Sequence, residues 1–296
     1  GDELVTASTS NLTETQKALT NGCGLTYDEY KTAYQKMLKS VYTYGGFWIG
    51  RYEAGIEGSI TDLTKARTGG TGGTGGITGP TSYDGTSVKV LKLATITTQS
   101  DNTNTLPKAI SQKDAIPYNW VTCSEAQSLA KEMTPNSNYT SSLMFGIQWD
   151  LVCKYLEAKD GLTEADIKED SSSWGNYENT KIENITAGKY AILDIRQFKL
   201  GTWTKITNAF TKSDSGDRAL LSTGISEYTK KMNIYNFASN EGEWTLENTS
   251  YSDSPCASRG GIYNSTGSDI PASSRLDDGT TGSYNVIGFR PALYAN

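Results

Sequence analysis

The sequence predicts an α+β fold, because helices and strands are indicated in no regular alternation. Two capping boxes, at Thr26 and Thr122, each precede a stretch with apolar residues at helical spacing, and the first helix is predicted over 27–42. A third helix is predicted over 147–158. Short strands are predicted at 47–52, 88–97, 243–246, 257–263 and 287–294.

The third predicted helix carries apolar residues that are expected to face the core: Leu151, Val152, Tyr155 and Leu156. Between about 160 and 240 the chain is rich in Gly, Asn, Ser and Thr, so we expect irregular structure there. No composition shift divides the chain. We therefore expect a single domain over 26–296, preceded by a loose polar arm over 1–25.

Composition and charge exclude several classes of partner. The chain has 296 residues, of which 36% are hydrophobic and 20% charged, as is typical of a globular protein. A net charge of −6 provides no electrostatic footprint for nucleic acid or for an anionic membrane. Apolar runs also fall short of the roughly 18 residues that a membrane span needs. We expect neither nucleic-acid binding nor membrane insertion.

The absence of histidine removes the commonest general base and the commonest metal ligand. Ser-His-Asp, Cys-His and His-zinc chemistry are therefore excluded. The four cysteines contain no CxxC pair, so no metal site of the zinc-finger kind is expected. Cys153 lies in an apolar helical stretch and is predicted to be a buried thiol. Cys123 and Cys256 could pair in an oxidising compartment, although sequence leaves the connectivity open.

Several short segments, taken in order, resemble the formylglycine-generating-enzyme branch of the C-type lectin fold. They are GGFWIGRYE at 45–53, YNW at 118–120, GIQWD at 146–150, NEGEWT at 240–245, RGG at 259–261 and IGFRPA at 287–292. The resemblance runs from about residue 27 to the end of the chain. One departure stands out: the family usually has an Asn-Val-Trp-Glu-Trp-like segment, and here Asn240, Glu241 and Gly242 replace its first half while Trp244 is kept.

The family's enzymes oxidise a substrate cysteine with a thiol pair that holds copper, and one of these thiols follows the Arg-Gly-Gly motif. No cysteine occurs from Arg259 to Asn296. Copper(I) prefers soft thiolate ligands, which this stretch cannot supply. The resemblance therefore implies that the fold is kept, that oxidase chemistry is lost and that the protein is not an enzyme. A catalytically active oxidase of this type is the alternative.

A related group with the C-type lectin fold, the variable proteins of diversity-generating retroelements, uses the same C-terminal region as a display surface. There, adenines of template codons, commonly AAC or AAT, are replaced at random. The products can never be Lys, Glu, Gln, Met or Trp. In this chain the last residues of these types are Lys231, Glu247, Gln197, Met232 and Trp244. The resemblance thus implies a variable ligand-binding region at about 259–290.

Candidate ligand-binding positions in this region share two properties: they show no periodicity, and their residue types are reachable from an Asn codon. They are Ile262, Asn264, Ser265, Asp269, Ile270, Ser274, Leu276, Asp277, Asp278, Gly279, Gly282, Tyr284, Asn285 and Val286. We expect them to cluster on one exposed patch. An ordinary Ser/Asp/Gly-rich loop is the alternative interpretation.

Other residues are expected to hold this region in place from the core. The candidate scaffold anchors are Trp244, Arg259, Phe289 and Arg290, together with Leu293. Both arginines adjoin small or apolar residues, so we expect them to be buried and to donate charge-assisted hydrogen bonds to loop carbonyls or carboxylates.

The predicted partner is a cell-surface protein or glycan, and the predicted location is a virion, such as a phage tail, or a cell surface. A tail or pilus tip module of fixed specificity is an alternative. No cofactor is required. Asp277 and Asp278 suggest calcium-dependent sugar binding, but the Glu-Pro-Asn or Gln-Pro-Asp tripeptides of such lectins are missing. A structural calcium ion elsewhere, on Asn and Asp oxygens, remains open.

Overall fold

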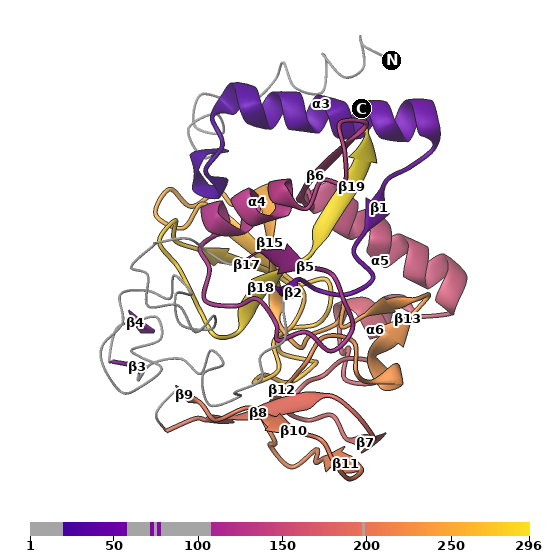
Figure 1. Cartoon of the computed structure of the whole chain (residues 1–296), viewed down its shortest axis with the longest axis vertical. Helices are drawn as coiled ribbons and strands as arrows, with labels where there is room; N and C mark the ends of the chain where they lie inside the picture. The colour runs from indigo at the N-terminus through magenta and orange to yellow at the C-terminus, as the bar shows by residue number, and fades with distance from the viewer. Residues whose placement is uncertain (1–19, 58–71, 74–75, 78–107, 197–198) are drawn as a thin grey trace.

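The computed structural model describes residues 20–57, 72–73, 76–77, 108–196 and 199–296. Within these residues the protein combines α-helices with several small sheets, which confirms the predicted mixture of α and β structure (Figure 1). The helices are α3 (Tyr27–Tyr44), α4 (Cys123–Glu132), α5 (Gly146–Asp160) and α6 (Glu164–Lys168), with 3-10 helices at Thr20–Cys23 and Glu227–Thr229. Within the described residues, every helix is too short or too polar to cross a lipid bilayer.

Both predicted capping boxes begin helices. The hydroxyl of Thr26 accepts from the Glu29 amide while the Glu29 carboxylate accepts from the Thr26 amide, so two donors at the start of α3 are satisfied. Thr122 and Glu125 form the same pair at α4. Helix α3 ends at Gly45, whose φ of 83° is left-handed.

Helix α5 covers the predicted third helix but orients part of it differently. Val152 and Leu156 are buried as predicted. Leu151 and Tyr155 are 47% and 45% exposed, so their predicted inward orientation is wrong. Apolar residues occupy a wider part of the helix surface than the face that contacts the core, so some of them are exposed. Trp149 is fully buried there and donates from its indole Nε1 to the Ala272 carbonyl at 3.0 Å.

A three-stranded antiparallel sheet joins distant parts of the chain. Its order is β1 (Trp48–Ile49), β19 (Pro291–Ala295) and β6 (Tyr139–Leu143). In Figure 1, β19 points toward α3 and β1 lies beside it. The strand predicted over 47–52 is only two residues long. Leu293, expected in the core, is half-buried because it lies on the less covered side of β19.

A second sheet carries the candidate region. Its order is β17 (Arg275–Asp278), β16 (Cys256–Arg259), β15 (Gly242–Asn248) and β18 (Ile287–Phe289), and the β15–β18 pair is parallel. Trp244 lies opposite Phe289 in that pair, and both side chains are fully buried. Strand β17 is the edge strand, with Arg275 and Asp277 exposed and the residues between and after them half-buried.

Much of the segment predicted to be irregular forms short strands at the end of the molecule opposite α3 (Figure 1). That prediction is wrong, because these strands pair with one another, β8 with the nearby β9 and with the more distant β12. At that end lie β7 (Ile182–Ile185), β8 (Lys189–Asp194), β9 (Lys199–Leu200), β10 (Thr204–Lys205), β11 (Phe210–Lys212) and β12 (Ala219–Leu221). A further antiparallel pair consists of β13 (Lys230–Lys231) and β14 (Ile234–Tyr235). Two-residue strands elsewhere are β2 (Gly55–Ile56), β3 (Gly72–Gly73), β4 (Gly76–Ile77) and β5 (Ala109–Ile110).

The predicted N-terminal arm and one predicted strand fall partly or wholly outside the described residues. The strand at 88–97 and residues 1–19 of the arm lie outside them. At the end of the arm, Cys23 and Leu25 are buried in the main hydrophobic cluster. The expectation of a loose arm up to residue 25 is therefore wrong for its last residues, whose apolar side chains pack on the domain.

A buried polar cluster lies between β2, β15 and β19. The Glu53 carboxylate is fully buried and accepts hydrogen bonds from the side-chain amides of Asn236, at 2.9 Å, and Asn240. Burial raises the pKa of Glu53 to about 8, and the nearby Arg290 guanidinium opposes that rise. Glu53 is therefore protonated in the folded protein at neutral pH, whereas in the unfolded chain it is ionised.

This difference predicts a pH-dependent stability. Between the ordinary glutamate pKa, about 4.3, and about 8, the folded state holds one proton more than the unfolded state. Stability from this group is complete below pH 4 and is lost as pH rises toward 8, at up to roughly 1.4 kcal/mol per pH unit. Glu53→Gln should flatten this slope in urea unfolding between pH 5 and 8. The matched variant Glu132→Gln, at the exposed end of α4, should keep it; an unchanged slope in Glu53→Gln would contradict the assignment.

Candidate functional site

The 259–290 region consists of two loops that flank the edge strand β17. The first loop leaves β16 at Gly260, whose φ of 78° permits the turn, and runs to Ser274. The second runs from Gly279 to Val286 and enters β18. Strand β17 pairs with β16 along its whole length, with Leu276 opposite Ser258 and Asp277 opposite Ala257. Both loops therefore start and finish on the same sheet.

Most of the predicted variable positions have solvent-accessible side chains or backbone. Asp269 and Asp277 are exposed. The half-buried positions are Ile262, Asn264, Ser265, Ile270, Ser274, Leu276, Asp278, Gly279, Gly282 and Tyr284. Ile262 and Tyr284 also pack in part against the main core cluster, so their accessible area is smaller than the sequence suggested.

Two of the predicted positions, Asn285 and Val286, are buried, and the expectation of an exposed side chain is wrong for both. Asn285 is 2% exposed; its Nδ2 donates to the Tyr263 hydroxyl at 3.4 Å and its carbonyl accepts from Asn119. Val286 is 9% exposed and lies in the main core cluster, and its carbonyl accepts from the Gly242 amide. These residues support β18 because they immediately precede it.

The buried side chain of Arg259 holds the backbone of the first loop. Its side chain is 1% exposed, and its Nε donates to the Ser274 carbonyl at 3.0 Å while Nη2 reaches the Ser273 carbonyl at 3.3 Å. Nη1 and Nη2 also donate to the carboxylates of Glu247, at 2.8 Å, and Asp150, at 2.7 Å. This confirms the predicted burial and the predicted bonds to carbonyls and carboxylates. A buried, charged side chain therefore holds loop backbone without using any loop side chain.

Arg290 follows β18 and joins segments that lie outside the two loops. It is fully buried, and its Nε and Nη2 donate to the Glu243 carboxylate over 2.7–3.1 Å. The Nη1 and Nη2 atoms also donate to the carbonyls of Gly50 and Tyr235, both at 2.8 Å. The predicted burial of Arg290 is confirmed. Through it, β15 is joined to the residue that follows β1 and to β14.

The first loop is also held by a segment that sequence reasoning missed. The amide of Glu178 donates to the Ser265 carbonyl at 3.0 Å, and the amide of Ser171 donates to the Gly267 carbonyl. The Asn179 side chain accepts from the Gly267 amide. No sequence motif predicts these contacts, because any residue other than proline can supply a backbone amide. These contacts hold the loop through its backbone at Ser265 and Gly267.

The side chains of Asp277 and Asp278 lie in different environments. Asp277 is exposed, whereas Asp278 is half-buried and accepts from the Ser258 hydroxyl at 3.1 Å and from Tyr284. Burial raises the pKa of Asp278. Among the described residues, no three His, Cys, Asp or Glu side chains converge as a metal site requires. Calcium also accepts carbonyl and amide oxygens, so the structural calcium ion stays an open expectation.

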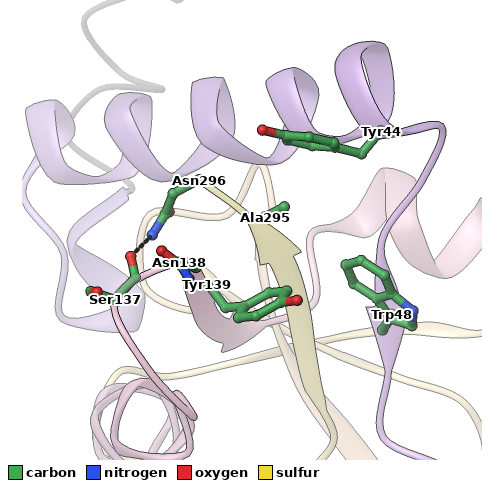
Figure 2. Close-up of a pocket in the computed structure, with 7 residues that line it drawn as sticks. All are labelled: Tyr44, Trp48, Ser137, Asn138, Tyr139, Ala295 and Asn296. Atoms are coloured by element: carbon green, nitrogen blue, oxygen red, sulfur yellow. Dashed lines mark hydrogen bonds between the residues drawn. The ribbon is translucent and has the colours of Figure 1, made fainter.

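A separate hollow lies outside the 259–290 region. It has a volume of about 370 Å³ and is lined by Tyr44, Trp48, Ser137, Asn138, Tyr139, Ala295 and Asn296. Figure 2 shows three aromatic side chains among the lining residues, Tyr44, Trp48 and Tyr139, and the Asn296 side-chain amide, which donates to the Ser137 carbonyl at 2.8 Å. Trp48 is 53% exposed and meets Tyr139 edge to face at 6.0 Å. Its walls come from α3, β1, β19 and the start of β6, so this hollow belongs to the scaffold.

Comparison with known proteins adds no family. No protein-family model, no curated protein and no solved structure matches the chain. The candidate site therefore stands on its geometry: two loops on which most candidate positions are exposed or half-buried, with buried residues that hold the backbone of the first loop.

The two arginines around Glu247 provide a matched test of this geometry. Arg259→Met should lower the free energy of unfolding by about 2–4 kcal/mol, since it removes the hydrogen bonds of a buried guanidinium to Glu247 and to two loop carbonyls. Arg275 contacts the same carboxylates but is 46% exposed, so Arg275→Met should cost less than about 1 kcal/mol. Urea denaturation measures both. Equal losses would show that Arg259 has no special role.

Proposed function

We propose that this chain is a ligand-binding protein of the receptor or adhesin type, with a C-type-lectin-like fold, and that a retroelement diversifies its 259–290 surface. One observation carries the proposal: Arg259 holds the backbone of the first loop through the carbonyls of Ser273 and Ser274. Side chains on such a loop can change while the backbone keeps its hydrogen bonds.

The proposed C-type-lectin-like fold is supported by how the family-like segments meet. The segment at 45–53 pairs with the final strand, with Trp48 opposite Leu293 and Ile49 opposite Ala292. The segments at 240–245 and 287–292 run in parallel and join Trp244 to Phe289. Three of the six family-like segments, at 45–53, 240–245 and 287–292, therefore lie in paired strands.

The proposed division between variable and fixed positions is supported by burial. Asp269 and Asp277 are exposed, whereas Arg259, Phe289 and Arg290 are at most 1% exposed. Residue types that adenine replacement cannot produce end at Glu247, whose carboxylate contacts Arg259. Glu247, the last residue of a type that adenine replacement cannot produce, therefore helps to hold Arg259 and, through it, the first loop.

The proposed partner is a protein or glycan on a cell surface, bound by a protein on a virion or cell surface. Asp269 and Asp277 offer exposed acceptors, and Leu276, Ile270 and Tyr284 offer partly exposed apolar area. Recognition then depends on shape and hydrogen bonds more than on long-range charge, since the exposed Arg275 balances part of the acidic charge. The proposal includes neither catalysis nor a required cofactor.

The alternative oxidase is tested by copper. All four cysteines are buried free thiols in the structure. Stoichiometric copper(I) binding that fails in Cys123→Ser would favour the oxidase, whereas no binding would favour the display function.

The DNA that flanks the gene gives the decisive test of diversification. We expect a reverse transcriptase gene and a near-repeat of the 3′ end that differs from it at adenines. The differing codons should be those of the exposed and half-buried positions, such as Asp277 and Ile270. Codons for Asn285 and Val286 should be identical in both copies, because these side chains are buried. Absence of the repeat would leave a module of fixed specificity.

Substitutions should separate binding from stability. Asp269→Lys and Asp277→Lys should change binding to a panel of intact bacterial cells, while the melting temperature moves by less than about 2 °C. Trp48→Ala, in the separate hollow, serves as the control and should leave the binding pattern unchanged. Val286→Ala should lower stability by roughly 1–3 kcal/mol. The proposal fails if the lysine variants unfold the protein or bind every cell type as the parent does.

A further inference from the structure

The hollow beside the end of α3 lies on one face of the β1–β19–β6 sheet. Trp48 on β1 pairs with Leu293, and Tyr139 on β6 pairs with Ala295, two residues further along β19. Because side chains alternate between the two faces of a sheet, Trp48, Tyr139 and Ala295 project from the same face. Tyr44, the last residue of α3, completes the aromatic lining. In the view of Figure 2, Ala295 lies between the ring of Tyr44 and the rings of the other two.

Two of these aromatic rings are accessible to a ligand. Tyr44 is 58% exposed and Trp48 is 53% exposed, although both side chains are large and partly apolar. Trp48 meets the half-buried Tyr139 edge to face, with 77° between the ring planes, so the two rings form adjoining walls. The small side chain of Ala295 leaves the space beside them unfilled. Exposed aromatic rings around an unfilled space are typical of a site for a small ligand.

The polar residues of the hollow comprise one that holds the backbone and two that are available to a ligand. The Asn296 side chain donates to the Ser137 carbonyl at 2.8 Å and accepts from the Thr140 hydroxyl at 2.6 Å, which orders the turn before β6. The Ser137 hydroxyl and the Asn138 side-chain amide are exposed, and neither has a hydrogen-bond partner among the described residues. Together they offer a ligand both donors and acceptors.

The lining favours a ligand that is polar and uncharged. The described residues around the hollow provide three aromatic rings, two amides, one hydroxyl and one methyl group, and no charged side chain. A sugar ring suits such a lining, because its C–H face packs on an aromatic ring while its hydroxyls exchange hydrogen bonds with amides and hydroxyls. A volume of about 370 Å³ is at the small end of the range for ligand pockets, about 300–1,000 Å³, and suits one sugar ring. Aromatic rings also attract quaternary ammonium ions, but no carboxylate side chain belongs to the described lining to balance that charge.

We propose that this hollow binds one neutral pyranose ring, the terminal sugar of a glycan, stacked on Trp48 and hydrogen-bonded to Ser137 and Asn138. The site is separate from the 259–290 surface, and the inference does not rest on the proposed function. A ligand of about a dozen heavy atoms at an exposed site binds with a Kd on the order of 1 mM. Such weak binding does not by itself retain the protein on cells, so the choice among cell types is left to the 259–290 surface.

Tryptophan fluorescence measures whether the hollow is occupied. Five of the six tryptophans are at most 2% exposed, so acrylamide quenches chiefly Trp48. We expect methyl β-D-glucopyranoside or methyl β-D-galactopyranoside to lower the quenching constant by about twofold, with half of the effect at a concentration on the order of 1 mM. Saturation-transfer NMR should show the strongest transfer to the C–H protons of one ring face. Sorbitol, which has the hydroxyls but no ring, should give neither signal.

Variants test the geometry of the hollow. Ala295→Leu fills the space and keeps all three rings, so it should abolish protection by sugar while Trp48 stays accessible to acrylamide. Tyr44→Ala should weaken sugar binding by about fivefold. The matched variant Tyr42→Ala removes a 73% exposed tyrosine outside the lining and should leave sugar binding unchanged. Asp277→Lys, on the 259–290 surface, should also leave it unchanged.

Three results would overturn the proposal. The first is the absence of both Trp48 protection and saturation transfer in the wild-type protein at about 50 mM sugar. This result decides even if a variant fails to fold. The second is protection by choline with none by either sugar, which would indicate a cation site. The third is loss of sugar binding in Asp277→Lys, which would assign the sugar to the 259–290 surface.

Discussion

The candidate surface depends on the contacts of Arg259. This buried guanidinium joins carboxylates on α5 and β15 to two carbonyls of the loop that follows β16. Removing an arginine of this kind takes away hydrogen bonds to two carboxylates and two half-buried carbonyls, which costs a few kcal/mol. Changing an exposed loop side chain costs far less. Because of this difference in cost, exposed loop positions can vary, whereas the buried positions that hold the loops cannot.

Local signals in the sequence predicted the fold well where they act over a few residues. The capping boxes at Thr26 and Thr122 place the starts of α3 and α4, since both partners lie within one turn. Thr163 begins α6 with Asp166 in place of the usual Glu or Gln, so that motif was missed. The strands between Ile182 and Leu221 depend on pairing across long separations, which no local pattern encodes.

The site was predicted in part for the same reason. Residue type distinguished Asp269 and Asp277 from the fixed positions, and the structure leaves both exposed. Residue type could not distinguish Asn285 or Val286, because an Asn codon also yields residues that suit a core. They are buried because they immediately precede β18 and contact Tyr263 and Gly242. These are tertiary contacts, which residue type alone does not predict. The support from Glu178 uses a backbone amide, which leaves no trace in sequence.

The most direct test of the central claim is a saturation library across 259–290, displayed on yeast and sorted for resistance to protease, with sequencing of the surviving variants. The account predicts broad tolerance at Asp269, Asp277 and their exposed or half-buried companions. It predicts strong depletion of nearly every substitution at Arg259, Val286 and Arg290. Uniform tolerance across the region, or depletion at Asp269 and Asp277 equal to that at the buried positions, would contradict it.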